Sequence, residues 1–88
     1  MAVRDKVGIR VISQSGTCIQ EHKVGDQWVI EEKTPGGICL FAFHSLVFHA
    51  QVLKFGGSFP WENDPAMVTV ACPDPGNPVV FELRRLQE

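Results

Sequence analysis

One apolar segment in the middle of the chain, Ile38 to Phe55, constrains the fold more than any other feature of the sequence. A TPGG stretch precedes this segment and Gly56-Gly57 follows it, and such residues are typical of the start and the end of a helix. Thr34 can cap the first turn, and Pro35 fits the first helical position. The sequence therefore predicts one long apolar helix over about residues 37–55.

Polar side chains within this segment, among them His44, His49 and Lys54, would be costly at the centre of a bilayer. The N-terminal stretch MAVRDKVGIR contains three charged residues before position 7 and no apolar run of signal-peptide length. We therefore expect a core helix in a cytoplasmic protein, with no membrane partner.

Four shorter segments have the alternation or the β-branched composition of strands. They are Val7 to Ser13, Trp28 to Glu31, Met67 to Cys72 and Val79 to Leu86. The chain has 88 residues and no internal repeat, which is the size of one small domain. We predict a single α+β domain over residues 1–88, in the order ββαββ, with an antiparallel sheet of about four strands packed on the helix.

Two lines of apolar side chains follow the predicted helix at 100° per residue. The first line should face the sheet and consists of Cys39, Ala42, Phe43, Leu46, Ala50 and Leu53. The second line, on nearly the opposite side, consists of Phe41, Phe48 and Phe55, seven residues apart, with Val52 beside them. Either loops or a second subunit must cover this second line, and the second possibility predicts a homodimer through Phe41, Phe48 and Phe55.

The composition is that of a soluble globular protein, with 20% charged residues and a net charge of -2. The eight Lys and Arg residues are scattered, so the sequence lacks the basic face of a nucleic-acid-binding protein. Their one doublet near the C-terminus, Arg84-Arg85, is expected to be a solvated strand end. We therefore expect no nucleic-acid partner.

The candidate chemistry lies in three cysteines, Cys18, Cys39 and Cys72, and two histidines, His22 and His44. An odd number of distant cysteines in a chain without an export signal disfavours a disulfide framework. Thiolate and imidazole together suit zinc, and three cysteines can hold an iron–sulfur cluster with one other ligand. No C-x2-C pair occurs, and Cys39 and His44 are about 140° apart around the helix, so the helix supplies at most one ligand.

The arrangement of the strands decides whether these residues meet. A simple antiparallel meander would place Cys39 and Cys72 at one end of the sheet, and Cys18 and His22 roughly 20 Å away at the other. A three-cysteine site then requires the first loop to fold back, the second strand to pair elsewhere, or a second chain. The alternative is that the thiols are packing residues, that His22 lies at the surface between charged neighbours, and that His44 lies at the solvent edge.

Several segments resemble the signature segments of a family of very small, functionally uncharacterised proteins found mainly in anaerobic bacteria and archaea. These segments read G-x-C, H-K-x-G-D, T-P-x-G-[IL]-C, F-H, G-x-F-P-W and C-P-D-P; here they include Cys18, His22 to Asp26, Thr34 to Cys39, Phe43-His44, Gly57 to Trp61 and Cys72 to Pro75. The resemblance covers nearly the whole chain and implies a stand-alone cytoplasmic domain, but no activity. It favours a shared thiol site, because the segments include all three cysteines, His22 and His44.

Three functions remain open. The leading hypothesis is a binding protein that holds a soft metal ion such as zinc, or an iron–sulfur cluster, through the three cysteines, with His22 or His44 completing the site. The first alternative is a non-catalytic dimeric interaction module with structural cysteines. The second is a thiol-dependent enzyme in which Cys39 is the nucleophile, His44 or His22 the base and Asp74 an orienting carboxylate.

Overall fold

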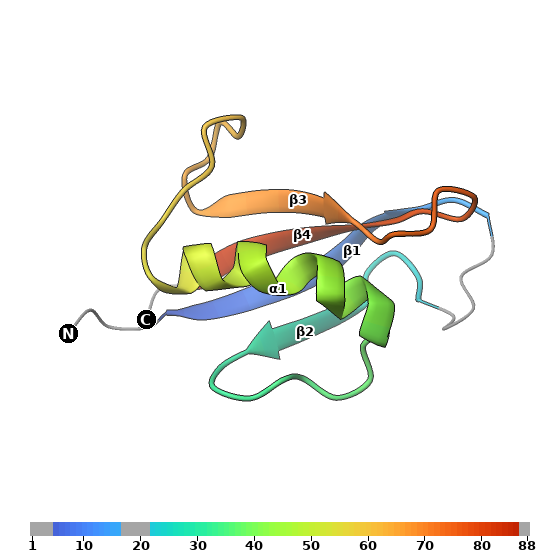
Figure 1. Ribbon diagram of the computed structural model, residues 1–88, viewed down its shortest axis with the longest axis horizontal. Coiled ribbons are helices and arrows are strands. Elements are labelled where there is room, and N and C mark those ends of the chain that lie inside the picture. The colour runs from blue at the N-terminus through green and yellow to red at the C-terminus, as the bar shows by residue number, and fades with distance from the viewer. Residues whose placement is uncertain (1–4, 17–21, 87–88) are drawn as a thin grey trace.

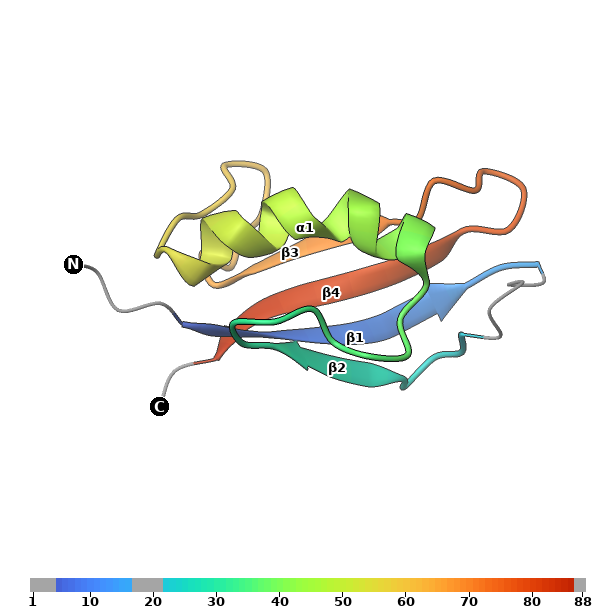
Figure 2. The ribbon, with the colours of Figure 1, turned by 60° about the horizontal axis from the view of Figure 1, so that its bottom comes forward.

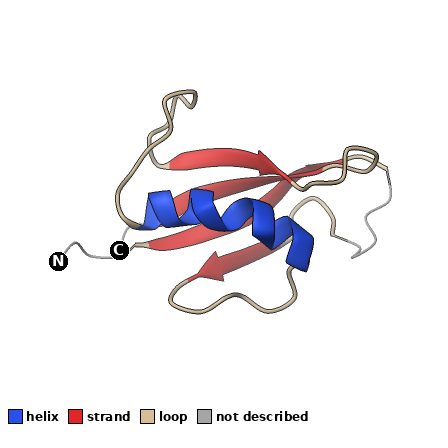
Figure 3. Cartoon of the chain, in the orientation of Figure 1, coloured by secondary structure: helices blue, strands red, loops and turns tan. Residues whose placement is uncertain are grey.

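Four antiparallel strands form one sheet, and a single helix lies across one face of it (Figure 1, Figure 2). The structure is a computed structural model that describes residues 5–16 and 22–86. The elements are β1 (Lys6–Gln14), β2 (Gln27–Ile30), α1 (Leu40–Lys54), β3 (Met67–Ala71) and β4 (Val79–Leu86). The predicted α+β class, the ββαββ order and the four-stranded antiparallel sheet are confirmed (Figure 3).

The strand order is β2-β1-β4-β3, so the sheet is not a meander. The two longest strands, β1 and β4, pair at the centre, and each forms a hairpin with a shorter edge strand. Gln14 pairs with Val79, and Ala71 pairs with Val80. The end of β1, the beginning of β2, the end of β3 and the beginning of β4 therefore share one end of the sheet.

The core lies between α1 and the face of the sheet beneath it. Alternate residues of the central strands are buried there, as the period of a strand requires. The helix contributes Ala42, Leu46, Ala50 and Leu53, while Cys39 and Phe43 are half-buried against the same cluster. The predicted sheet-facing line of the helix is therefore confirmed.

The long apolar helix expected over about residues 37–55 is wrong in extent and in character, because α1 has 15 residues and starts at Leu40. Thr34 and Pro35 lie in the preceding loop, and the residue at the N-cap position is Cys39. Five polar residues interrupt α1: His44, Ser45, His49, Gln51 and Lys54. Within residues 5–16 and 22–86, no helix has the length and apolar character needed to cross a membrane.

The predicted helix stop at Gly56-Gly57 is confirmed. The backbone N–H of Gly57 donates to the carbonyl of Val52 at 2.8 Å, and that of Gly56 donates to Leu53 at 3.1 Å. This is the bond pattern of a Schellman motif, which needs a left-handed residue after the C-cap. Gly56 supplies it with a φ of 85° at no steric cost.

Candidate functional site

Three of the five predicted ligands lie at one end of the sheet. Cys39 lies at the start of α1, Cys72 directly after β3, and His22 in the segment before β2. The separation of roughly 20 Å between His22 and Cys39 that we expected for a meander is not observed, because the residues between Ile30 and Leu40 return along the sheet and α1 begins at the end where His22 lies. Cys18 lies outside the described residues.

His22 is a buried core residue, not the surface residue that its charged neighbours indicated. Its side chain is 6% exposed, and its ring makes edge contacts with Trp28 at 5.0 Å and Phe81 at 6.3 Å between ring centroids. Its Nε2 atom accepts the backbone N–H of Cys39 at 2.9 Å. Because a backbone N–H can only donate, Nε2 is unprotonated in this contact and the neutral ring carries its proton on Nδ1.

The two described cysteines, Cys39 and Cys72, are free of disulfides and half-buried. Cys39 holds the N-cap position without a side-chain hydrogen bond to the first turn. The Cys72 N–H donates to the Val79 carbonyl at 2.9 Å, and the Val79 N–H donates to the Cys72 sulfur at 3.3 Å. Both cysteines pack against the core cluster, which is how structural thiols behave.

The remaining candidate residues do not join this end of the sheet as ligands. His44 is exposed on the outer side of α1. Asp74 accepts the backbone N–H groups of Gly76 at 3.1 Å and Asn77 at 3.3 Å, so its carboxylate shapes the β3–β4 turn. Among the described residues, no three His, Cys, Asp or Glu side chains are grouped so that they could hold a metal ion.

The outer face of α1 is the most unusual surface among the described residues. Phe41 is 68% exposed, Phe48 is 69% exposed and Phe55, at the C-cap, is 58% exposed. Leu40 and Val52 are exposed beside them. We call Phe41, Phe48, Phe55 and Val52 the outer face, and the loops within residues 5–16 and 22–86 leave it exposed.

An aromatic stack borders the outer face on its β3 side. The His49 ring stacks on Phe59 at 5.4 Å between centroids, and Phe59 contacts Trp61 at 5.0 Å. His49 Nδ1 lies 3.1 Å from the Ser45 carbonyl, to which it must donate because a carbonyl can only accept. Trp61 is 66% exposed, so apolar surface continues from the helix onto the loop before β3.

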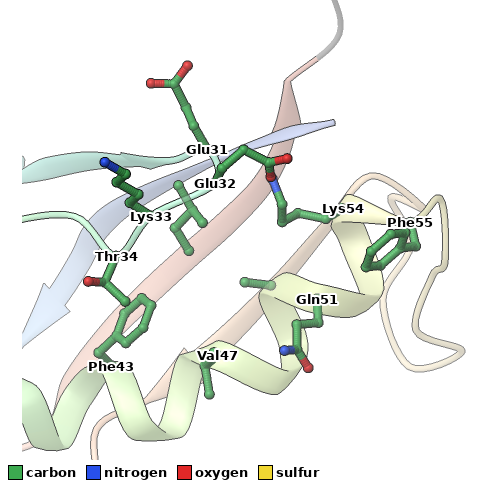
Figure 4. Close-up of a pocket in the computed structure, with 11 residues that line it drawn as sticks. Glu31, Glu32, Lys33, Thr34, Phe43, Val47, Gln51, Lys54 and Phe55 are labelled. Atoms are coloured by element: carbon green, nitrogen blue, oxygen red, sulfur yellow. The ribbon is translucent and has the colours of Figure 1, made fainter. Parts of the chain in front are cut away.

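A pocket of about 230 Å³ lies between α1 and the loop that follows β2 (Figure 4). It exists because one helix, ~10 Å wide, is too narrow to cover all four strands of a sheet in which neighbours are ~4.8 Å apart. The helix packs mainly on β1, β3 and β4, which leaves the inner side of β2 to the loop. Ile30 and Ala50 are among the pocket's apolar residues, while two acidic and two basic side chains at its rim cancel in charge: Glu31, Glu32, Lys33 and Lys54.

Sequence reasoning missed one anchoring residue, Arg85. Its Nη1 atom donates to the carbonyls of Leu53 and Gly57 at 2.9 Å, and Nη2 donates to Pro65 at 3.2 Å. The side chain is 11% exposed, so the expectation of a solvated strand end is wrong for Arg85. Odd-numbered residues of β4 point toward the helix, and this alternation in the sequence indicates that Arg85 is on the helix side of the sheet.

Comparison with models of known protein families, with characterised proteins and with solved structures finds no match for this chain. The resemblance to the family of small proteins from anaerobes stays a prediction. Among the described residues, the outer face of α1 is the feature that most suggests a function.

Proposed function

We propose that this protein is a small, non-catalytic interaction module that associates with a second copy of itself through the outer face of α1. The observation that supports this proposal is the exposure of Phe41, Phe48 and Phe55, at 68, 69 and 58%, in one line along the helix. Monomeric proteins rarely leave a contiguous apolar patch of this kind in water unless it has a partner.

The area of the outer face suits a weak dimer. A whole phenylalanine side chain buries roughly 200 Å², so three rings at these exposures offer roughly 400 Å² per copy. Leu40 and Val52 add to this area. Two copies would thus bury on the order of 1,000 Å², which is at the low end for specific complexes and above most accidental contacts. We expect association that depends on concentration.

The charge distribution favours a second copy as the partner. None of the exposed residues of α1 is Asp, Glu, Lys or Arg; they are Leu40, Phe41, His44, Phe48, Gln51 and Val52. The charged helix residue, Lys54, is buried, and its Nζ donates to the Asp5 carbonyl at 2.9 Å. An identical face therefore brings no like charge against this one, while a charged partner finds no counter-charge.

The test is the mass in solution of the wild type and of Phe48→Glu, measured by sedimentation equilibrium from micromolar to millimolar protein. The wild type should shift from monomer to dimer as concentration rises. Phe48→Glu should stay monomeric with an unchanged circular dichroism spectrum, because its carboxylate would lose water in the interface. The control Val24→Glu places the same charge on a 63% exposed side chain that is not part of α1 and should still dimerise.

A wild type that stays monomeric at millimolar concentration would contradict the proposal. A Phe48→Glu variant that dimerises as well as Val24→Glu would show that another surface associates. Both outcomes require that the variants fold, and the circular dichroism spectrum measures folding independently of the mass.

A second function, cysteine-based binding of a soft metal ion or an iron–sulfur cluster, is supported by one observation. Cys39, Cys72 and the His22 segment share one end of the sheet. Since the described residues contain no three-ligand group, this function requires Cys18. Metal and sulfide analysis of protein prepared without oxygen tests it: about one metal ion or cluster per chain is expected, and traces far below that would contradict it. A thiol-dependent enzyme remains the third hypothesis, and a single cysteine with unusual reactivity would support it.

A further inference from the structure

A loop that follows α1 holds an exposed tryptophan in a fixed position. We propose that the loop of residues 57–65, between α1 and β3, is a second part of the self-association surface, and that Trp61 at its centre contacts the second copy. This inference rests on the proposed function, and it adds a recognition loop and an anchoring residue to the interface.

One side chain closes this loop at both ends. Arg85 of β4 donates to the Gly57 carbonyl at 2.9 Å and to the Pro65 carbonyl at 3.2 Å. The two ends therefore lie close together, and Trp61 is the middle residue of the segment between them. Compact surface loops whose ends are close in this way are frequently functional.

Both acidic residues of the loop bond to the sheet. The Glu62 carboxylate accepts the Thr69 backbone N–H at 3.0 Å and the Thr69 hydroxyl at 3.2 Å. The Asp64 carboxylate accepts the Arg84 guanidinium at 2.7 Å. The loop is thus fixed on β3 and β4, and its two carboxylates have donors within the chain, so they do not oppose an uncharged partner such as the outer face of a second copy.

Trp61 stays exposed although the loop around it is fixed. Its side chain is 66% exposed, and its ring contacts Phe59, which stacks on His49 of α1. A side chain on a fixed support loses less conformational freedom on binding than a mobile one, and that saving favours association. Tryptophan is also among the residues that contribute most to the stability of interfaces. A fixed and exposed Trp61 is therefore suited to recognition.

The loop leaves the helix directly beside the outer face. The Gly57 N–H donates to the Val52 carbonyl at 2.8 Å, and a Cβ atom at position 57 would lie 2.6 Å from the Val52 Cγ1 atom. Only a glycine allows this close approach. Val52 and the stack of His49 and Phe59 therefore join the outer face to Trp61 without a charged side chain between them.

The added area brings the interface into the range of specific complexes. A tryptophan side chain of roughly 250 Å², exposed as Trp61 is, offers roughly 150 Å² in each copy. Two copies would then bury roughly 1,300 Å² in place of roughly 1,000 Å², and specific interfaces bury about 1,200–2,000 Å². The area that Trp61 supplies is thus what a specific dimer needs beyond the outer face.

The experiment compares the wild type with Trp61→Ala by sedimentation equilibrium from micromolar to millimolar protein. Trp61→Ala should raise the dimer dissociation constant by about tenfold or more. The matched control Val24→Ala truncates another exposed apolar side chain, outside α1 and the loop, and should dimerise as the wild type does. Both variants should keep the circular dichroism spectrum of the wild type, because both positions are exposed.

A second readout follows Trp61 in the wild type itself. The chain contains two tryptophans, so its indole N–H groups give two signals in a nitrogen-15 correlation spectrum, and Trp61→Phe identifies the signal of Trp61. This signal should shift as the concentration of the wild type rises, and it should stay fixed in Phe48→Glu. The signal of Trp28, which packs on His22 and Phe81, should not move in either protein.

The results separate this inference from the proposed function. If Phe48→Glu is monomeric but Trp61→Ala dimerises as tightly as the wild type, or the Trp61 signal stays fixed while the wild type dimerises, the role of Trp61 is wrong and self-association through the outer face stands. If the wild type stays monomeric at millimolar concentration, the proposed function fails, and the role of Trp61 fails with it.

Discussion

At the scale of the residue, His22 shows how a functional candidate becomes a structural one. The imidazole is enclosed by two aromatic rings and uses its one free acceptor on the Cys39 N–H, at the first residue before α1. This bond satisfies a backbone donor at a helix start that has no side-chain cap. A buried ring committed to such a bond is poorly placed to act as a base or a ligand.

Replacing His22 by Ala should lower the free energy of unfolding by about 2–4 kcal/mol, because the variant loses buried ring contacts and leaves the Cys39 N–H without its acceptor. His22→Phe keeps a ring but not the acceptor, and it should lose about 1–2 kcal/mol. Urea denaturation of dilute protein measures both, with the exposed His44→Ala as a control that should stay within about 0.5 kcal/mol. An equally mild effect of His22→Ala would refute the structural role.

The Asp64 carboxylate makes the stability of the fold depend on pH. The backbone N–H of Ala66, at 2.9 Å, and then the Arg84 guanidinium, at 2.7 Å, lower the pKa of this carboxyl from its ordinary value of 3.8. A lowered pKa means that its stabilisation is complete above the unfolded value and is lost as the pH falls through the folded one.

The wild type should therefore be more stable than Asp64→Asn at pH 7, and this difference should shrink below about pH 4 and vanish at lower pH. Thermal unfolding of both proteins between pH 7 and pH 2 measures the difference. A gap between the two that stays constant over this range would contradict the role of the Asp64 carboxylate.

At the scale of the element, the sequence predicts what depends on local pattern and misses what depends on long-range pairing. The sheet-facing line of α1, its glycine stop and the four strands all follow from periodicity and from residues that disfavour helices. The start of α1 does not follow from the local pattern, although Thr34 and Pro35 are residues that favour a helix start. The end of β2 and the beginning of β3 lie at the same end of the sheet, and a single helix that leads into β3 must start at the other end. The residues between Ile30 and Leu40 therefore run back along the sheet before α1 begins.

The sheet order could not be read from local pattern either. The pairing of β1 with β4 joins segments about 70 residues apart, such as Gly8 with Arg84, and no turn between them reports it. His22 meets Cys39 because the residues between Ile30 and Leu40 return along the sheet before α1 begins, and no local pattern reports that path either. The arrangement of these residues could therefore not be predicted from the sequence, and their role as a binding site stays a prediction.

Arg85 joins the end of α1 to β4, and Arg85→Lys should remove most of that connection. A lysine cannot reach three carbonyls in the planar arrangement of a guanidinium, so we expect a loss of about 2–3 kcal/mol in the free energy of unfolding. The matched control is Arg10→Lys, whose side chain is 52% exposed and should lose less than about 0.5 kcal/mol. Equal losses in the two variants, measured by urea denaturation, would disprove the anchoring role.

At the scale of the whole molecule, one helix has two apolar faces and only one sheet to cover. The inner face forms the core, and the outer face stays exposed in the single chain. An 88-residue domain buries a smaller fraction of its surface than a larger domain does, so the second copy that we propose would add stability as well as function. The sequence predicted the second apolar line and gave a homodimer as one way to cover it. The structure shows that the described residues leave Phe41, Phe48 and Phe55 exposed, and the homodimer stays a proposal.

The most direct test of self-association through α1 is an isotope-filtered nuclear Overhauser experiment on a mixture of labelled and unlabelled protein at millimolar concentration. Such an experiment detects only contacts between different copies. We predict cross-peaks between copies that involve the ring protons of Phe48, Phe41 and Phe55 and the methyl groups of Val52. The absence of these cross-peaks, with the protein shown to be folded, would contradict the account.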